Sequence, residues 1–267
     1  MKQLKLMVLT LTLLMGTMFT SCMDSGESGP QQWAGVVKVN DRMGYVTFTD
    51  AAGTELIPTN TIPVTLNARM AYIYCQVDEG QDLSTTPKSI KITLLADPTG
   101  IDATAITTPK VGESGDVTTN APVGSLSFAS GYSTVAPFQF SENTIVLPVL
   151  YRVKNVTTTE DIKKELAKHT FTLVCYTDDI KSGDTILKLY LRYKVEDEPA
   201  AIAERATRTS SFKAYEISQI LREYTLKSGQ AKPAKITIVA QQNEYNNKLE
   251  DTSTTEKVYE IEYKTAE

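Results

Sequence analysis

Residues 184–195, DTILKLYLRYKV, decide the predicted fold, because apolar and polar side chains alternate along the whole stretch. One face carries Leu187, Leu189, Leu191, Tyr193 and Val195, and the other carries Lys188, Tyr190, Arg192 and Lys194. A period of two is typical of a strand that buries one face and exposes the other. The stretch therefore predicts a half-buried antiparallel strand.

The neighbouring segments predict partners for this strand. Residues 169–176 also alternate, and the turn signal at residues 181–183 (KSG) joins the two stretches as a hairpin. Further strands are expected at residues 145–151, 236–238 and 259–263, with Pro148 confining its strand to an edge or a bulge. A β-sandwich over residues 122–267 is the simplest way to cover these one-sided sheets.

Two short helices are expected within the sandwich. Thr157 and Glu160 have the spacing of a capping box, after which Ile162 and Leu166 should face inward. The second helix has an apolar stripe and should end near Gly229. That stripe consists of Ile217, Ile220, Leu221 and Tyr224.

The first half of the chain predicts a second, smaller β domain over residues 33–97. Residues 33–40 and 43–50 should form a hairpin around Asp41-Arg42, and three more short strands follow before residue 97. Five short strands favour a small barrel or a compact sheet. Residues 98–121 lose the alternation and contain turn signals, so a linker or long loop is expected there.

The N-terminus has the order of an export signal. Lys2 and Lys5 precede an apolar stretch, and small residues lead up to Cys22. The apolar stretch is too short for a membrane-spanning helix, so residues 1–21 are predicted to be a cleaved signal peptide. A cysteine at the cleavage point resembles a bacterial lipobox, although Phe19 replaces the usual leucine or valine. Cys22 is therefore the predicted lipidation site, followed by a flexible tether over residues 22–32.

The net charge of the mature chain argues against a nucleic-acid partner. Without Lys2 and Lys5, the mature chain has 25 basic and 32 acidic residues, a net charge of −7. An acidic exported chain is a poor ligand for a phosphate backbone, so no nucleic-acid partner is expected.

With Cys22 lipidated, Cys75 and Cys175 remain. Both occupy inward positions of predicted strands, which favours two buried thiols over a disulfide.

The sequence offers little catalytic equipment. His169 is the one histidine in the chain, and no G-x-S-x-G or glycine-rich phosphate loop is present. We expect His169 to face solvent at a strand end rather than to act as a base. Asp178, Asp179 and Asp184 lack the spacing of a calcium loop and favour a plain turn. The acidic run at residues 196–198 is interpreted as a solvated strand end. No metal, cofactor or catalytic residue is predicted.

The chain resembles the NigD-like lipoproteins of the Bacteroidota. The resemblance rests on Cys22 and on residues 71–77 (AYIYCQV), 169–174 (HTFTLV) and 187–193 (LKLYLRY). It implies an OB-like N-terminal domain followed by a β-sandwich, and it supplies no active-site residues. The predicted fold class is therefore all-β: a small OB-like barrel, then an antiparallel β-sandwich with one or two short helices.

Two short sequence patterns resemble an export signal and a glycosylation acceptor. Asp24 and Glu27 resemble a surface-export signal, which favours the outer leaflet of the outer membrane. A plain solvated linker explains these two acidic residues equally well. Residues 184–186 (DTI) resemble an acceptor for O-glycosylation, with Thr185 as the modified residue. The mixed aromatic and cationic face around Tyr190 suits recognition, although a solvated sheet face explains it as well.

The predicted function is that of an exported, lipid-anchored cell-envelope protein, held to the outer membrane through Cys22. It is expected to be a non-enzymatic module that binds an unknown protein or glycan. One alternative is an accessory role in bacteriocin export or immunity, which the family resemblance alone implies. The other is a carboxylate-dependent hydrolase, which the acidic loops suggest.

Overall fold

The computed structural model describes residues 31–42, 45–60, 66, 68–81, 88–113, 115–130 and 133–265. These residues form two compact units. The first contains the described residues up to Ala103 and those within Ala129–Val135, and the second contains the described residues of Thr104–Phe128 and from Ala136 onward. None of the described helices has the length and apolar character needed to span a bilayer.

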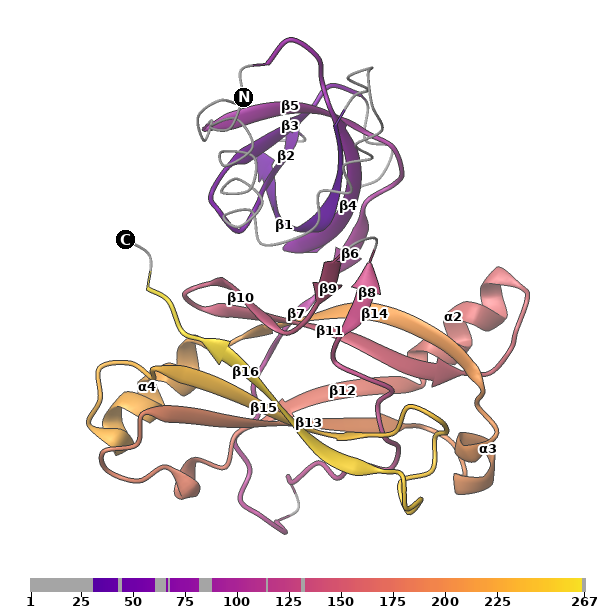
Figure 1. Cartoon of the computed structure of the whole chain (residues 1–267), viewed down its shortest axis with the longest axis vertical. Coiled ribbons are helices and arrows are strands. Elements are labelled where there is room, and N and C mark those ends of the chain that lie inside the picture. Colours follow the sequence, from indigo (N-terminus) through magenta and orange to yellow (C-terminus); the bar gives the residue numbers. More distant parts are fainter. Residues whose placement is uncertain are drawn as a thin grey trace. The chain divides into compact units, whose positions relative to one another are not determined.

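The first unit is built on a closed five-stranded barrel (Figure 1). Its strands are β1 (Gln32–Arg42), β2 (Tyr45–Thr49), β3 (Glu55–Pro58), β4 (Met70–Val77) and β5 (Ser89–Leu94), and β6 (Thr99–Ile101) adds to β4. They pair in the order β1-β2-β3-β5-β4, and β4 returns to β1 to close the ring. Only β3 and β5 run parallel, and the other pairs are antiparallel. This arrangement confirms the OB-like barrel.

The barrel core follows from the alternation of its strands. Val37, Phe48 and Ile73 are fully buried, and Cys75 and Ile92 are nearly so. The β1–β2 hairpin is present as predicted, but its turn is displaced. Asp41 and Arg42 still pair with β2, because the ladder continues to Arg42 opposite Tyr45.

The second unit is a sandwich of two four-stranded sheets. One sheet has the order β10-β11-β14-β7, with β10 at Phe138–Ser141, β11 at Thr144–Val153, β14 at Thr207–Glu216 and β7 at Ala103–Ala105. The other has the order β12-β13-β15-β16, with β12 at His169–Val174, β13 at Ile186–Val195, β15 at Lys235–Gln242 and β16 at Thr255–Glu262. A separate short pair, β8 (Phe128–Ser130) with β9 (Ser133–Val135), lies mostly in the first unit. Inward side chains of both large sheets share one hydrophobic core, which confirms the sandwich.

One strand pair departs from the predicted antiparallel pattern. The β12–β13 hairpin is antiparallel, but β13 and β15 run parallel, with Leu187 opposite Ile236. Between them the chain crosses to the other sheet as β14 and returns through a helix, so it re-enters the sheet in the same direction. Pro148 lies between the end of the β10–β11 ladder at Val146 and a bridge from Ser125 to Leu150. Contrary to the predicted edge position, β11 is an inner strand between β10 and β14, and the missing N–H of Pro148 interrupts no ladder pair on the β10 side.

Three helices lie at the two ends of the sandwich (Figure 1). They are α2 (Thr159–Ala167), α3 (Pro199–Ala203) and α4 (Ser218–Ser228), and a single 3-10 turn covers Thr177–Asp179. The helix α4 is as predicted, since Ile220 and Tyr224 are buried and Gly229 ends it with a left-handed φ of 74°. The sequence did not predict α3.

The helix α2 exists, but its predicted details are wrong. Its cap is Thr158, whose hydroxyl accepts from the Asp161 N–H at 3.1 Å, one residue later than the expected box. Ile162 and Leu166 are each 41% exposed, and the buried residue of α2 is Glu165. An ionic contact, described below, thus replaces the expected apolar one.

The stretch expected as a linker also differs from its prediction. Residues 98–121 supply β6 to the first unit and β7 to the second. Within the second unit, Cys175 donates its N–H to the Thr107 carbonyl at 2.9 Å, and Asn120 donates its N–H to the Tyr193 carbonyl at 3.1 Å. The division between the units lies at Ala103/Thr104, inside this stretch.

Candidate functional site

The outer face of β13 brings together the aromatic and cationic side chains that its alternation predicts. Leu187, Leu189 and Leu191 point into the core and are at most 2% exposed. Lys188 and Lys194 on the opposite face are exposed, while Tyr190 and Arg192 are half-buried. The strand therefore presents a row of polar and aromatic groups on a rigid support.

Cations and rings alternate along this row. The Lys188 ammonium lies 5.0 Å and the Arg192 guanidinium 5.1 Å from the centre of the Tyr190 ring. Arg192 also lies 5.7 Å from the centre of the Tyr176 ring, which meets Tyr190 edge-on at 5.3 Å. Contacts of this kind are worth about 0.5–2 kcal/mol each, so they hold Arg192 in one place.

A chain of hydrogen bonds joins Arg192 to an acidic loop. Arg192 Nη2 donates to the Tyr176 hydroxyl at 2.8 Å, and that hydroxyl donates to Asp116 Oδ1 at 2.8 Å. Asp116 Oδ2 accepts from the Gly112 N–H at 3.1 Å. The Gly112 N–H, then Tyr176 and the nearby Arg192 charge lower the pKa of Asp116, so its carboxylate stays ionised.

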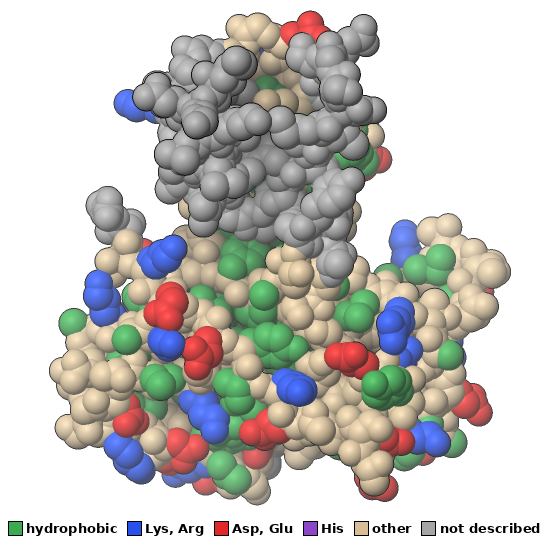
Figure 2. Space-filling view, in the orientation of Figure 1, with side chains coloured by type: hydrophobic (Ala, Val, Ile, Leu, Met, Phe, Trp, Pro, Cys, Tyr) green, Lys and Arg blue, Asp and Glu red, His purple; other side chains and the backbone are tan. Residues whose placement is uncertain are grey.

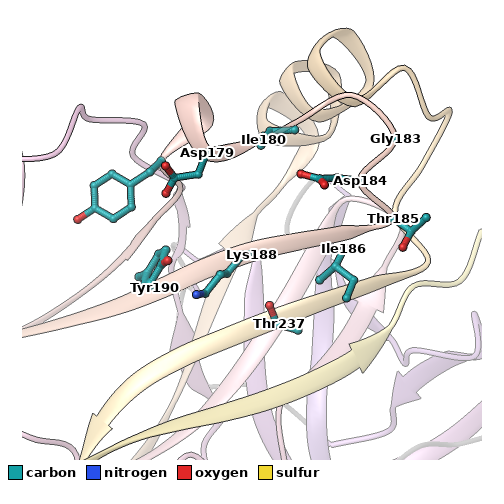
Figure 3. Close-up of a pocket in the computed structure, with 10 residues that line it drawn as sticks. Asp179, Ile180, Gly183, Asp184, Thr185, Ile186, Lys188, Tyr190 and Thr237 are labelled. Carbon is teal, nitrogen blue, oxygen red and sulfur yellow. The ribbon is translucent and has the colours of Figure 1, made fainter.

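Two hollows lie beside this chain, and both are lined by Tyr176. The first has a volume of about 510 Å³ and is lined also by Asp179, Asp184, Lys188 and Tyr190. Figure 3 shows Asp179 and Asp184 on the loop that precedes β13, and Lys188 extending along β13 toward Tyr190. The second has a volume of about 410 Å³. Both volumes fall within the range of roughly 300–1,000 Å³ that is common for ligand sites.

Two residues that line the second hollow each have a polar atom without a partner. The hollow is lined by residues that include Asp116, Thr119, Tyr176, Arg192, Gln241 and Leu249. Arg192 Nε and Thr119 Oγ1 are shielded from solvent and have no hydrogen-bond partner among the described residues. A shielded polar group without a partner costs about 1–3 kcal/mol, and the shielding keeps both atoms out of the direct reach of a ligand.

Acidic and basic groups occur together in both hollows. Asp116 and Arg192 line the second, while Asp179, Asp184 and Lys188 line the first. The face of the second unit seen in Figure 2 likewise carries both signs interspersed, without a large area of one sign. Such a surface has no strong field for steering a highly charged partner.

His169 is buried, contrary to the prediction that it faces solvent. Its side chain is 1% exposed, with Nδ1 lying 2.6 Å from the Tyr193 hydroxyl and Nε2 lying 3.3 Å from Glu165 Oε1. Burial lowers the pKa of His169, and the Glu165 carboxylate opposes this only in part. The strand β12 begins at His169, directly after α2, and the Glu165 carboxylate of that helix lies against Nε2 of the imidazole ring.

Glu165 belongs to an internal ionic cluster around Arg205. Arg205 is completely buried and donates from Nε to Glu165 Oε1 at 2.7 Å and from Nη2 to Asp197 Oδ2 at 3.0 Å. Asp197 also pairs with Lys154 and Lys168. The hydrogen bonds from Arg205, Lys168 and Lys154 hold the pKa of Asp197 far below the usual range. Asp197 is thus an ion-pair hub and not the solvated strand end that was expected. None of these side chains lines either hollow.

Two of the three carboxylates in the predicted acidic turn have partners within the protein. Asp178 pairs with Lys227 at 3.0 Å, and Asp184 Oδ2 accepts from the Lys181 N–H at 2.7 Å. Within the part of the chain that the structure describes, no three His, Cys, Asp or Glu side chains form a group that could hold a metal ion.

The remaining site predictions have different outcomes. Cys75 and Cys175 are free and buried in different units, as predicted, and burial raises the pKa of each thiol to about 12. Thr185 is exposed and lines the first hollow. Cys22 lies outside the described residues.

Sequence reasoning identified Lys188, Tyr190 and Arg192 but missed two partners. Tyr176 was counted only as the end of a strand, and Asp116 fell in the expected linker. The two residues are 60 positions apart in the chain, so no local pattern connects them.

Comparison with known proteins finds no matching family model and no matching curated protein. Among solved structures, the protein BF3042 from Bacteroides fragilis NCTC 9343, assigned as a lipoprotein, is 95% identical over 89% of this chain and 100% of its own, with a TM-score of 0.82. A DUF1344 protein of unknown function from Bacteroides vulgatus ATCC 8482 is 11% identical over 87% of this chain and 91% of its own, with a TM-score of 0.54. A NigD-like immunity protein from Bacteroides caccae ATCC 43185 is 11% identical over 88% and 94%, with a TM-score of 0.49. The DUF1344 likeness concerns the fold alone.

Proposed function

Because this chain belongs to the lipoprotein family of BF3042, we propose that it is a lipid-anchored envelope protein that works as a binding module. Family membership makes it a membrane-anchored protein of the cell envelope. Its barrel and sandwich are the two domains that the NigD-like resemblance implies.

The anchor that we propose is lipid on Cys22. Residues 22–32 then act as the tether between the membrane and the folded units. Acyl chains contribute about 0.8 kcal/mol for each buried CH₂ group, and two or more chains give stable attachment. Asp24 and Glu27 support a position on the outer surface of the outer membrane, which is part of this proposal.

The binding surface that we propose is the outer face of β13 with its two hollows, and the ligand is a glycan or a protein. The observation that carries this proposal is the Arg192–Tyr176–Asp116 chain, which fixes three recognition groups that line the second hollow. Rigidly held polar groups lower the cost of ordering an interface.

The test compares two substitutions in the portion of the chain that matches the crystallised relative. Tyr176→Phe keeps the ring but removes the hydroxyl that links Arg192 to Asp116, so partner capture from envelope extracts and glycan arrays should fall. Tyr245→Phe makes the same change at a tyrosine that is 79% exposed and lines neither hollow. Equal capture by both variants would contradict the proposed surface.

One observation favours a second candidate, the carboxylate-dependent hydrolase. Asp179 and Asp184 both line the first hollow, so two carboxyl groups are available to one ligand. For this candidate, Asp179→Asn should abolish the hydrolysis of a chromogenic glycoside or peptide while leaving binding intact. Failure of the unaltered protein to turn over any such substrate counts against it.

The accessory role in bacteriocin export or immunity rests on the family resemblance alone. A deletion strain with unchanged bacteriocin sensitivity and secretion would remove it.

A further inference from the structure

We propose that the two hollows form one extended site for a neutral saccharide chain. This inference rests on the proposed binding function and names the chemistry of its ligand. Three features of the outer face support it: Tyr176 lines both hollows, their lining groups carry both signs of charge, and the Tyr190 ring supplies aromatic surface.

The hollows are adjacent, since Tyr176 lines both. Tyr190 lines the first hollow and Arg192 lines the second, and these are successive outward positions of β13. Such positions are about 7 Å apart along a strand. A linear ligand lying along β13 can therefore contact both hollows at once.

The lining groups favour hydroxyl groups over charged ones. A hydroxyl both donates and accepts, so it can satisfy the carboxylates of Asp116 and Asp179 as well as the cations of Lys188 and Arg192. A polyanion would meet the carboxylates in both hollows, and a polycation would meet Arg192 and Lys188. A neutral, polyhydroxylated chain avoids both penalties.

Aromatic surface is present at the junction of the hollows. Tyr190 lies between Lys188 and Arg192, and Lys188 is the exposed member of this stack. Moving the flexible Lys188 side chain uncovers the Tyr190 ring for the C–H face of a sugar, while Arg192 stays fixed by Tyr176.

Isothermal titration with defined oligosaccharides tests the proposal. The probes are neutral gluco-, manno- and xylo-oligosaccharides of increasing length, with oligogalacturonate as the anionic comparator and oligoglucosamine as the cationic one. We expect at least one neutral series to bind, with affinity that rises with length. Arg192→Met should weaken that binding about tenfold, since bonds to charged groups are the stronger ones.

Two further variants separate binding from folding. Lys188→Met removes an exposed cation that lines the first hollow, so the melting temperature should not fall while affinity drops about threefold. Lys163→Met removes an exposed cation from α2, which lines neither hollow, so affinity should not change.

The outcomes distinguish the two proposals. A charged comparator that binds as tightly as the neutral chains, or a Lys188→Met protein with full affinity, overturns the neutral saccharide site. If no oligosaccharide binds while the β13 face is protected in the native envelope, the saccharide assignment fails and the binding function stands. If that face is also unprotected, both fail.

Discussion

Replacing Arg205 with methionine should destabilise the second unit more than any comparable change at its surface. The guanidinium is fully buried and reaches Glu165 Oε1 at 2.7 Å, Glu165 Oε2 at 3.3 Å and the Ala201 carbonyl at 2.8 Å. Removing one partner of a buried ion pair costs roughly 3–5 kcal/mol, because the other charge is left without compensation.

The remaining contacts of Glu165 place the cost near the lower limit. Its carboxylate keeps the Lys154 N–H at 2.9 Å and His169 Nε2 at 3.3 Å. We therefore expect a loss of about 3 kcal/mol in the free energy of unfolding. For a domain of this size, that loss lowers the melting temperature by roughly 6–12 °C.

Urea unfolding followed by tyrosine circular dichroism measures this change. Trp33, the single tryptophan, lies in the first unit, so its emission reports on that unit separately. Arg222→Met is the matched control, because Arg222 is exposed on α4 and its loss should stay within about 0.5 kcal/mol.

A double-mutant cycle tests the cause of the effect. Glu165→Gln removes the charge that Arg205 compensates, so the double variant should lose about 0.5–3 kcal/mol less than the sum of the single losses. Strict additivity, or a loss below about 1 kcal/mol for Arg205→Met, would refute the reasoning.

Three other predictions follow from the structure and the sequence. Burial lowers the pKa of His169 below its ordinary 6.5, so the unfolded chain takes up that proton first and stability should begin to fall as the pH drops below about 6.5. Burial alone would raise the pKa of Glu165, but hydrogen bonds outweigh it and hold the pKa below 4.5. The loss of stability should therefore steepen under about pH 4.5. Constant stability in urea titrations from pH 8 to 4 would argue against this. Thr185→Ala should remove any glycan mass from the protein isolated from its native host, whereas unaltered protein with no added mass would exclude modification. Cys22→Ala should leave a folded protein that no longer incorporates a fatty-acid label or sediments with membranes, and persistent sedimentation would exclude lipidation at Cys22 as its anchor.

The parts of the fold that depend on local alternation could be predicted from the sequence. The β12–β13 hairpin is one example, because each strand carries its own period of two and a glycine turn separates them. The helix α4 is another, since its apolar stripe and Gly229 lie within one short segment.

The parts that depend on distant charges could not be predicted. An apolar stripe through Ile162 and Leu166 suggested the buried face of α2, but Arg205, 40 residues after Glu165, makes burial of that carboxylate favourable. The same cluster buries His169. The second hollow likewise needs Asp116 and Arg192 to meet at Tyr176, which only the folded sandwich brings about.

Hydroxyl-radical footprinting tests most directly whether the outer face of β13 is the binding surface. The labelling of Ile186, 47% exposed beside the first hollow, is compared between native envelopes and detergent-extracted protein. Tyr245, 79% exposed and outside both hollows, is the internal reference. Labelling of Ile186 and Tyr190 should drop in the envelope while that of Tyr245 stays the same. Unchanged labelling of all three residues would contradict the proposed surface.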